Sequence, residues 1–419
     1  MLLQKKKTGV GNVKTIVFIE TNKSGSSREA IKAAERLGYL TVLLTKRKRY
    51  LAQRTEFPDV HQMYYVKNLE SKLLKNKINF LQTQGKEVVA VVSFIDPFVQ
   101  VAVQLSSELS RNEYINLNAV AEMEDKILTR QALEGLALSP VYTVVDQSDL
   151  RIGEILETPI CFPLIVKAPV STGSKDVLFV EGPLQLETAV QSLTIKERNQ
   201  RVLIEEYLDG PQYLVEVMVQ KGVAHLVAVI EQEISRNNRF IVTGYGVLAM
   251  VSKEMKQSLK KVAQFIVSTF EVENGTFHLE LKRVNKQWKI IEINPRISGG
   301  VMNRLIQAAF GMNLVEETIK LYTGQQVSFR KSQLKFAYAQ YLTVQTKGRL
   351  KKVTGKQRAL RHEGVEEVYI KPRKGAFMTP PFSMGHRYGY VLASAYTLSE
   401  AKNIAQNAAK EIQFHLQPV

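Results

Sequence analysis

Two carboxylates, an amide and a guanidinium occur close together near the end of one predicted β-hairpin. The strand "KIIEINPR" places Glu292, Asn294 and Arg296 at every second position, so that all three share one face. With Asn285-Lys286-Gln287 as the turn, the preceding strand brings Glu280 directly opposite Glu292. Facing carboxylates destabilise a hairpin unless something compensates their charge. Two carboxylates and an amide oxygen are ligands suited to Mg²⁺ or Mn²⁺.

The opposite face of this hairpin is apolar, with Leu279, Leu281, Ile291 and Ile293. One face is therefore expected in the core, and the other either lines a metal site or is solvated. We favour the metal site because this face is acidic in a basic protein. His278 lies beside Glu280, where it either reaches a substrate or is a hydrogen-bonded structural residue.

A magnesium site held by few carboxylates is usually completed by substrate phosphates, so a phosphate site is expected elsewhere. The turn "APVSTGSKDV" (168–177) has hydroxyls and Lys175 that could wrap phosphate oxygens. It lacks the GxxxxGK[ST] pattern, and a flexible hairpin turn is the alternative. Lys167 ends the apolar strand "PLIVK", where it must be snorkelling or paired, and phosphate is a candidate partner.

A short connection between two strands, "LIEEYLDGPQYLVEV" (203–217), has the form of a hinge between domains. Such a hinge can present backbone N–H and C=O groups to an adenine edge while Tyr207 and Leu208 cover its face.

The elements that must position these residues follow two different patterns. Residues up to about 115 alternate strands and helices, which predicts an open α/β domain with a parallel sheet. Its "SGSS" turn (24–27) is either an anion site at a helix start or a plain tight turn. From 116 onward a helix pair or one long helix is followed by hairpins and helices at 252–270 and 301–323, an α+β pattern. Residues 331–419 form a small α+β domain that ends in a helix from Ser399 to about His415.

The length, net charge and composition of the chain argue against several classes of protein. The chain has 419 residues and a net charge of +17, but its basic residues are scattered, and the dense run "KRKR" (46–49) lacks interleaved aromatics. We therefore favour attraction of an anionic small molecule over nucleic-acid binding. The single Cys161 excludes a disulfide framework and fits a reducing compartment. No apolar run approaches the roughly 18–20 residues of a membrane span, so a soluble cytoplasmic protein is expected.

In order, the chain contains "EDKILTRQAL", "PLIVKAPVSTGSKDV", "IEEYLDGPQYLVEV", "FHLELK" and "WKIIEINPRISGG". This order and spacing resemble the ATP-grasp superfamily of carboxylate–amine ligases over about residues 116–323. The tail, with "GVEEVYIKPRKG" and "PPFSMGHRYGYVLASAYTLSEA", is similar to the L-amino-acid ligase branch, the bacterial dipeptide synthetases.

The resemblance implies an ATP-grasp fold of the mixed α/β and α+β class. Its parts would be a Rossmann-like N-terminal α/β domain (1–115), a small ATP-grasp subdomain (116–209), a large subdomain with the metal site (210–330) and a C-terminal α+β domain (331–419).

The resemblance also implies roles for individual residues. Those that would bind ATP are Lys126, Lys167, the mobile loop Ser171, Thr172, Gly173, Ser174 and Lys175, and the adenine-pocket residues Glu205, Glu206, Tyr207 and Leu208. Those that would hold magnesium, as two ions, are Glu280, Glu292 and Asn294. Those that would hold substrate are Arg296, His278, Gly299 and Gly300, and Arg296 would act in catalysis with Lys175 and Ser174. Many family members have Glu at the position of Gln212, where it holds the ribose; here Gln212, Asp209 or Glu216 could take that contact.

The expected reaction joins two free L-amino acids through an aminoacyl-phosphate, with release of ADP and phosphate. The alternatives are another ATP-grasp ligase or carboxylase with a different acid and amine, a basic non-catalytic nucleic-acid-binding protein, and an ATP sensor with a dead site. The expected partners are therefore small molecules, ATP and two amino acids, and a homodimer remains an alternative to a monomer.

Overall fold

The computed structural model describes residues 12–110, 114–146, 160–171, 173, 175–194, 201–235 and 240–418. The N-terminal part is a parallel sheet in the order β3-β2-β1-β4, as the alternation of strands and helices predicted. Its strands are β1 (Val13–Ile19), β2 (Leu40–Thr45), β3 (Gln62–Tyr65) and β4 (Lys86–Val92). Its helices are α1 (Ser26–Arg36), α2 (Lys48–Ala52), α3 (Ser71–Thr83) and α4 (Val99–Leu109). The side chains of β1 from Thr15 to Ile19 are buried, as expected for a parallel sheet that is covered on both faces.

The helix pair expected after residue 116 is present as α5 (Leu117–Glu124) and α6 (Lys126–Ala132). Asp125 separates the two helices, and its carboxylate accepts hydrogen bonds from the N–H groups of Ile127 and Leu128 at the start of α6. A small antiparallel sheet follows, in the order β5-β8-β6-β7, with α8 (Pro183–Thr194) packed against it. Its strands are β5 (Tyr142–Val145), β6 (Leu164–Lys167), β7 (Val177–Val180) and β8 (Val202–Glu206).

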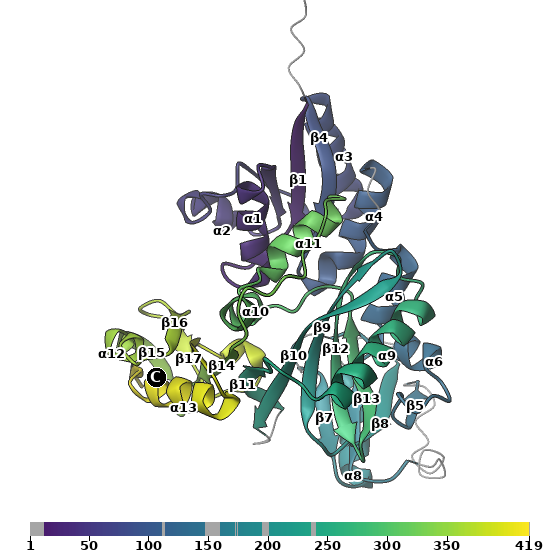
Figure 1. Cartoon of the computed structure of the whole chain (residues 1–419), viewed down its shortest axis with the longest axis vertical. Helices are drawn as coiled ribbons and strands as arrows, with labels where there is room; N and C mark the ends of the chain where they lie inside the picture. The colour runs from purple at the N-terminus through teal and green to yellow at the C-terminus, as the bar shows by residue number, and fades with distance from the viewer. Residues whose placement is uncertain are drawn as a thin grey trace, which may run out of the picture.

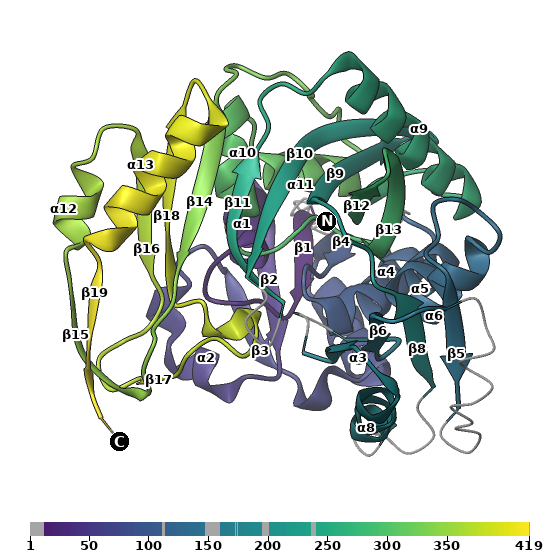
Figure 2. The ribbon, with the colours of Figure 1, turned by 90° about the horizontal axis from the view of Figure 1, so that it is seen from below.

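The largest sheet has eight strands in the order β13-β12-β9-β10-β11-β14-β18-β16. Five of them come from the region before residue 331: β9 (Gln212–Gln220), β10 (Val223–Ser235), β11 (Ile241–Val247), β12 (Gly275–Val284) and β13 (Gln287–Asn294). Three come from the region after it: β14 (Phe336–Leu342), β16 (Val365–Ile370) and β18 (Gly389–Ala395). The edge of β11 is covered by β14, so the expected C-terminal domain shares a sheet with the region before it (Figure 2).

The rest of the C-terminal region is a three-stranded sheet with two helices. These elements are β15 (Gly348–Thr354), β17 (Phe377–Met378), β19 (Gln413–Gln417), α12 (Lys356–Leu360) and α13 (Leu398–Lys410). The helix predicted to reach about His415 therefore ends at Lys410, because the chain turns back and His415 pairs in β19.

The long helix expected over 301–323 is also two helices, α10 (Met302–Phe310) and α11 (Leu314–Tyr322). They are separated at Gly311, whose φ of 66° ends α10 in the left-handed region. In Figure 1, α11 lies beside α1, and an ion pair of 3.3 Å between Arg36 and Glu316 joins the two helices. The helix expected over 252–270 is α9 (Lys253–Thr269). None of the helices in the described ranges has the length and apolar character that a membrane span requires.

The register predicted for the β12–β13 hairpin is confirmed: Glu280 pairs with Glu292, and His278 with Asn294. Two details differ. The turn has two residues, Asn285 and Lys286, both with positive φ, because Gln287 already pairs with Val284. The register also shifts after Glu280, as at a β-bulge.

The register shift changes which isoleucine belongs to the core. Ile290, not Ile291, pairs with Leu281 and is fully buried. Ile291 instead lines a cavity beside Glu292, contrary to the prediction that it shares the apolar face.

Candidate active site

A cavity of about 750 Å³ lies where the three main sheets meet. Nearly all of the predicted site residues line it: Lys126, Lys167, Gly173, Lys175, Glu205, Glu206, Tyr207, Leu208, Gln212, His278, Glu280, Glu292, Asn294, Arg296, Gly299 and Gly300. Ser171 is not among the lining residues. The predictions for Thr172 and Ser174 lie outside the described residues.

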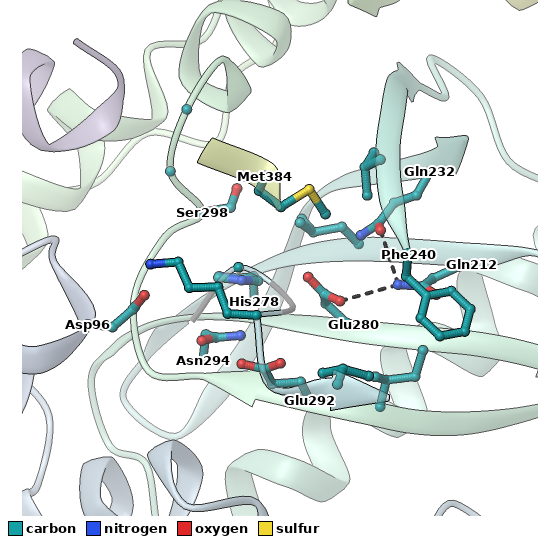
Figure 3. A pocket seen from close by; sticks show the side chains of 18 of the residues that line it. Asp96, Gln212, Gln232, Phe240, His278, Glu280, Glu292, Asn294, Ser298 and Met384 are labelled. Carbon is teal, nitrogen blue, oxygen red and sulfur yellow. Dashed lines mark hydrogen bonds between the residues drawn. The ribbon is translucent and has the colours of Figure 1, made fainter. Parts of the chain in front are cut away.

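Glu280 and Glu292 face each other at the centre of the cavity (Figure 3). Burial, and then the charge of Glu292, raise the pKa of Glu280 to about 7. Burial also acts on Glu292, but the charges of Lys126 and Lys167 outweigh it and hold the pKa of Glu292 below its usual value. The Lys126 Nζ atom is 3.5 Å from Glu292 Oε1. The two carboxylates therefore disfavour each other's ionisation, and a cation bound between them would relieve this repulsion.

The protein offers few side-chain ligands to a metal ion at this position. Among the described residues, no three His, Cys, Asp or Glu side chains gather as a metal site would require. An ion on Glu280 and Glu292 would need the amide oxygen of Asn294 and oxygens from a substrate. This fits magnesium, which is often bound by one or two carboxylates and phosphates.

A buried group of three charges lies beneath this pair. Glu205 lies between Lys167, with Nζ 2.6 Å from Oε2, and Arg130, with Nε 2.5 Å from Oε1. Burial lowers the pKa of Lys167 to about 8, although Glu205 opposes the change. Burial also acts on Glu205, but Arg130 and Lys167 hold the pKa of its carboxyl below its usual value. The Glu205 carboxylate is thus held between these two cations, and Glu205 also lines the cavity, so its place in an adenine pocket stays a prediction.

Arg130 is the member of this group that sequence reasoning missed. Its side chain is fully buried, and Nη2 donates to the carbonyl of Ile291 at 2.9 Å. It lies in the quoted stretch "EDKILTRQAL", but its position on α6 does not distinguish it from a surface arginine.

The expected adenine region contains an aromatic and cationic wall. The Lys282 Nζ atom donates to the carbonyl of Leu208 at 2.6 Å and lies 4.9 Å from the centre of the Tyr207 ring. Tyr207 also contacts Phe179, with ring centres 5.1 Å apart. Figure 3 shows Phe240, another cavity residue, near Gln212.

Gln212 is directly connected to the carboxylate pair. Its Nε2 donates to Glu280 Oε2 at 3.2 Å and to Gln232 Oε1 at 3.1 Å. Glu216, considered for the ribose contact, is fully buried and does not line the cavity. Its carboxylate instead accepts a hydrogen bond of 3.1 Å from the N–H of Ser298.

Arg296 forms an ion pair with Asp96, which follows β4 in the N-terminal region. Its Nη1 donates to the carbonyl of Ile297 at 3.0 Å. His278 makes a hydrogen bond of 2.9 Å between Nδ1 and the carbonyl of Arg296. Burial, and then Arg296, lower the pKa of His278 to about 4, so it is neutral. His278 thus has the hydrogen bond expected of a structural residue, but it also lines the cavity, so its contact with a substrate stays a prediction.

The glycine turn that follows Arg296 contacts the N-terminal region. The Ser26 hydroxyl donates to the carbonyl of Ser298 at 2.7 Å. A Cβ atom at Gly25 would lie 2.9 Å from the carbonyl oxygen of Gly300, so only glycine allows this approach. The "SGSS" turn therefore packs against the Ser298–Gly300 segment.

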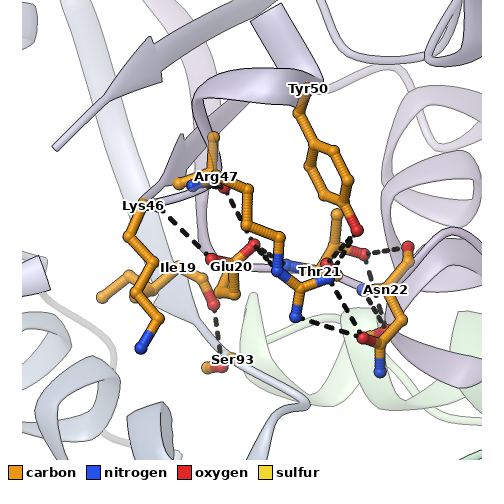
Figure 4. Close-up of polar contacts among 10 residues, drawn as sticks. Ile19, Glu20, Thr21, Asn22, Lys46, Arg47, Tyr50 and Ser93 are labelled. Carbon is orange, nitrogen blue, oxygen red and sulfur yellow. Dashed lines mark hydrogen bonds and ion pairs between the residues drawn. The ribbon is translucent and has the colours of Figure 1, made fainter. Parts of the chain in front are cut away.

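Polar residues at the carboxyl ends of β1 and β2 extend the cavity (Figure 4). Asn22 and Arg47 line it, and Arg47 Nε is 3.6 Å from the Oε1 atom of the buried Glu20. Ligand sites are common at this edge of parallel sheets. Sequence reasoning treated Arg47 only as part of "KRKR". The structure places Arg47 and Lys46 over the rings of Tyr50 and Phe98, at 5.2 and 5.1 Å.

The C-terminal region closes the other side of the cavity, which sequence reasoning did not foresee. Its lining residues are Tyr341, Met384, Gly385 and Arg387. Figure 3 shows Met384 across the cavity from Glu292.

Two parts of the chain match models of known protein families. Residues 160–304 match the model of the ATP-grasp domain, and residues 340–417 match the model described as L-amino acid ligase C-terminal domain 2. A curated relative, an uncharacterised protein of Sinorhizobium fredii, is 27% identical over 260 residues, which are 61% of this chain and 54% of that protein. Dapdiamide A synthase of Enterobacter agglomerans is 22% identical over 74% of this chain and 73% of its own length. The chain spans 54%, 39% and 46% of the lengths of the first three curated relatives that it matches.

Solved structures show the same fold over nearly the whole chain. The L-amino acid ligase of Bacillus licheniformis has a TM-score of 0.82 at 20% identity, covering 97% of this chain and 100% of that one. The biotin carboxylase domain of Hydrogenobacter thermophilus 2-oxoglutarate carboxylase, solved with MgADP and bicarbonate, has a TM-score of 0.72 at 14% identity. It covers 96% of this chain and 91% of that one.

Proposed function

Since the chain belongs to the ATP-grasp superfamily and has the C-terminal domain of L-amino acid ligases, we propose that it joins two free L-amino acids into a dipeptide. The first amino acid is activated as an aminoacyl-phosphate, with release of ADP, and the amine of the second displaces phosphate.

The observation that supports this proposal most directly is the facing pair Glu280 and Glu292 in a cavity that also contains cations. Lys126 is 3.5 Å from Glu292, and Lys167 and Lys175 line the same cavity. Carboxylates that hold magnesium beside lysines that bind phosphate are the arrangement required for transfer of a γ-phosphoryl group.

Glu280, Glu292 and Asn294 would hold magnesium, as two ions, or manganese in its place. The metal would supply positive charge to the phosphate oxygens.

Arg296 binds the carboxylate of the acid substrate beside the nucleotide. A carboxylate oxygen attacks the γ-phosphorus atom, the bond to the β-phosphate oxygen breaks, and ADP leaves. Arg296, Lys126 and Lys167 neutralise the charge that is spread over the transferred group. The amine nitrogen of the second amino acid then attacks the acyl carbon, the bond to phosphate breaks, and the leaving phosphate takes the amine proton.

The walls of the cavity also shield the acyl-phosphate intermediate from water. An acyl-phosphate hydrolyses readily, so water must be kept from it. Loop residues Gly173 and Lys175 on one side and Met384 of the C-terminal region on another form walls of the cavity. A Cβ atom at Gly173 would lie 3.7 Å from the Met384 Cβ, so these two walls are in contact.

The test is phosphate release from ATP and magnesium with all pairs of proteinogenic amino acids, with mass spectrometry of the products. We expect phosphate release that requires amino acids, one ADP for each dipeptide, and a product mass equal to two amino acids minus water. Turnover with bicarbonate or another acid, and none with amino-acid pairs, would instead assign the chain to another ligase or carboxylase chemistry.

A further inference from the structure

The reaction proposed above gives no role to Arg387, a residue of the C-terminal region. It follows a short helical turn, η5 (Met384–His386), and lines the cavity. Its guanidinium carbon lies 3.8 Å from the centre of the Tyr341 ring and 5.8 Å from that of Tyr245. Nε donates to the carbonyl of Met384 at 3.2 Å and Nη1 to that of Val242 at 3.4 Å. The guanidinium is thus held in one orientation by an aromatic face, two carbonyls and a hydrogen bond with the Tyr245 side chain.

The charge of Arg387 has no acidic partner among the described residues, unlike that of the other two cavity arginines. Arg296 pairs with Asp96, and Arg47 lies 3.6 Å from Glu20. The groups that act on Arg387 are the phenols of Tyr341 and Tyr245. Burial raises the pKa of Tyr245 to about 12, so it remains neutral and offsets no charge. A partly buried guanidinium with no carboxylate partner is costly unless a ligand supplies the anion.

The position of Arg387 is next to the proposed reaction centre. The Tyr341 hydroxyl lies 3.4 Å from where a Cβ atom at Gly300 would be, so Tyr341 and Arg387 adjoin the glycine turn. On the other side, Tyr245 is close enough to Glu280 for that carboxylate to raise its pKa, after the larger effect of burial. An anion on Arg387 would therefore lie between the glycine turn and the carboxylate pair.

The proposed reaction brings three kinds of anion into the cavity. In the proposed function, lysines bind the phosphates of ATP and Arg296 binds the carboxylate that is activated. The carboxylate of the amino acid that supplies the amine has no cation assigned to it.

We infer that Arg387 binds this third carboxylate and so selects a free α-amino acid as the amine substrate. The inference rests on the proposed function and names the cation for one of its two amino acids. Tyr341, which stacks on the guanidinium, acts as a positioning residue. An amino acid whose carboxylate is replaced by a carboxamide would leave Arg387 without its anion.

The decisive experiment compares an amine substrate with its carboxamide at a fixed acid substrate, using the full-length protein and the best pair from the screen above. For the wild-type protein we expect kcat/KM to be about 100-fold lower with the carboxamide, because a buried charge would lose its partner. Equal use of both compounds would overturn the inference. This comparison needs no variant.

Variants then assign the effect to Arg387. We expect Arg387→Gln to lower kcat/KM for the free amino acid by about 100-fold, mainly through KM, and to leave the carboxamide nearly unchanged. We expect kcat/KM of Arg387→Lys for the free amino acid to lie between those of the wild-type protein and Arg387→Gln, because lysine keeps the positive charge but cannot form two parallel hydrogen bonds to a carboxylate. The matched control is Arg373→Gln, since the side chain of Arg373 is 70% exposed and pairs with Glu56 outside the cavity. The control should match the wild-type protein.

The possible outcomes separate this inference from the proposed function. A rise of KM for ATP without a rise for the amine substrate would assign Arg387 to a phosphate and overturn the inference. Preserved discrimination against the carboxamide in Arg387→Gln would also overturn it while leaving the proposed function intact. Absence of dipeptide with the wild-type protein would overturn the proposed function, and the inference with it.

Discussion

The Glu216 carboxylate accepts hydrogen bonds from both the backbone N–H and the hydroxyl of Ser298. Glu216 is fully buried, and burial, only partly opposed by these bonds, raises its pKa to about 7. The bonds join the middle of the eight-stranded sheet to the turn that leads to Gly299 and Gly300. The acid that holds this turn is therefore largely protonated below neutral pH, and its ionisation disfavours the folded state.

A pH dependence of stability follows for Glu216. Its folded pKa of about 7 lies above the ordinary 4.5, so the folded state binds more protons between these values. The contribution of Glu216 to the free energy of unfolding is therefore fully present below about pH 4.5 and is lost as the pH rises through about 7. We expect Glu216→Gln, which keeps a hydrogen-bond acceptor, to be more stable than the wild-type protein at pH 8 by roughly 2–3 kcal/mol.

Denaturant unfolding of both proteins between pH 5 and pH 8 measures this difference, which should shrink toward pH 5. Glu273→Gln is the control, because Glu273 is exposed, and it should show no such trend. A constant difference across the range would contradict the raised pKa of Glu216.

Replacement of Glu292 tests the metal site. We expect Glu292→Gln to lower ADP formation by at least about 10³-fold while leaving the thermal transition in place, because an amide cannot replace the charge that balances a cation. Glu231→Gln is the control, since Glu231 is an exposed carboxylate on β10 of the same sheet, outside the cavity. Near-normal turnover in Glu292→Gln would contradict the metal assignment.

Removal of divalent metal gives a second test of the same site. We expect EDTA to abolish ADP formation, and added Mg²⁺ or Mn²⁺ to restore it. The wild-type protein should also show a metal-dependent rise in thermal stability in the presence of ADP, which Glu292→Gln should lack. A metal-dependent rise of equal size in both proteins would place the metal elsewhere.

The polar face of the hairpin was predictable because alternation along a strand is a local rule. Alternation puts Glu280, Glu292 and Asn294 on one side. Their pairing was predicted correctly because the expected three-residue turn gives the same register at Glu280 as the observed two-residue turn followed by the shift. The shift that sends Ile291 into the cavity was not predictable, because a bulge leaves no mark in the alternation of polar and apolar residues.

Residues brought to the site by long-range packing were also missed. Arg130 reads as a surface residue of a short helix, and only its contact with Glu205 shows that it is buried. Arg387 reaches the cavity because β14 pairs with β11, a contact between strands about ninety residues apart in the chain. No local pattern specifies such a pairing, which is why the C-terminal region was expected to be separate.

Arg296 should not tolerate replacement by lysine. Its guanidinium reaches Asp96 and the carbonyl of Ile297 at the same time, and an ammonium group cannot reproduce this fork. We expect Arg296→Lys to lower kcat/KM for the acid substrate by about 100-fold. Arg358→Lys is the control, since the side chain of Arg358 is 60% exposed and pairs with Glu411 at the surface. Unchanged kinetics for the acid substrate would remove Arg296 from the proposed mechanism.

The buried group Arg130, Glu205 and Lys167 should be sensitive to loss of its only carboxylate. Glu205→Gln leaves two buried cations without a counter-charge, so we expect a loss of about 3–5 kcal/mol in the free energy of unfolding. Glu206→Gln is the matched control one position along β8. Glu206 is partly exposed, accepts the N–H of Val141 at 2.9 Å and lies 3.7 Å from Lys289, so its loss should cost less than about 1 kcal/mol. Equal losses in the two variants, measured by urea unfolding at pH 7, would show that Glu205 does not hold the two cations in place.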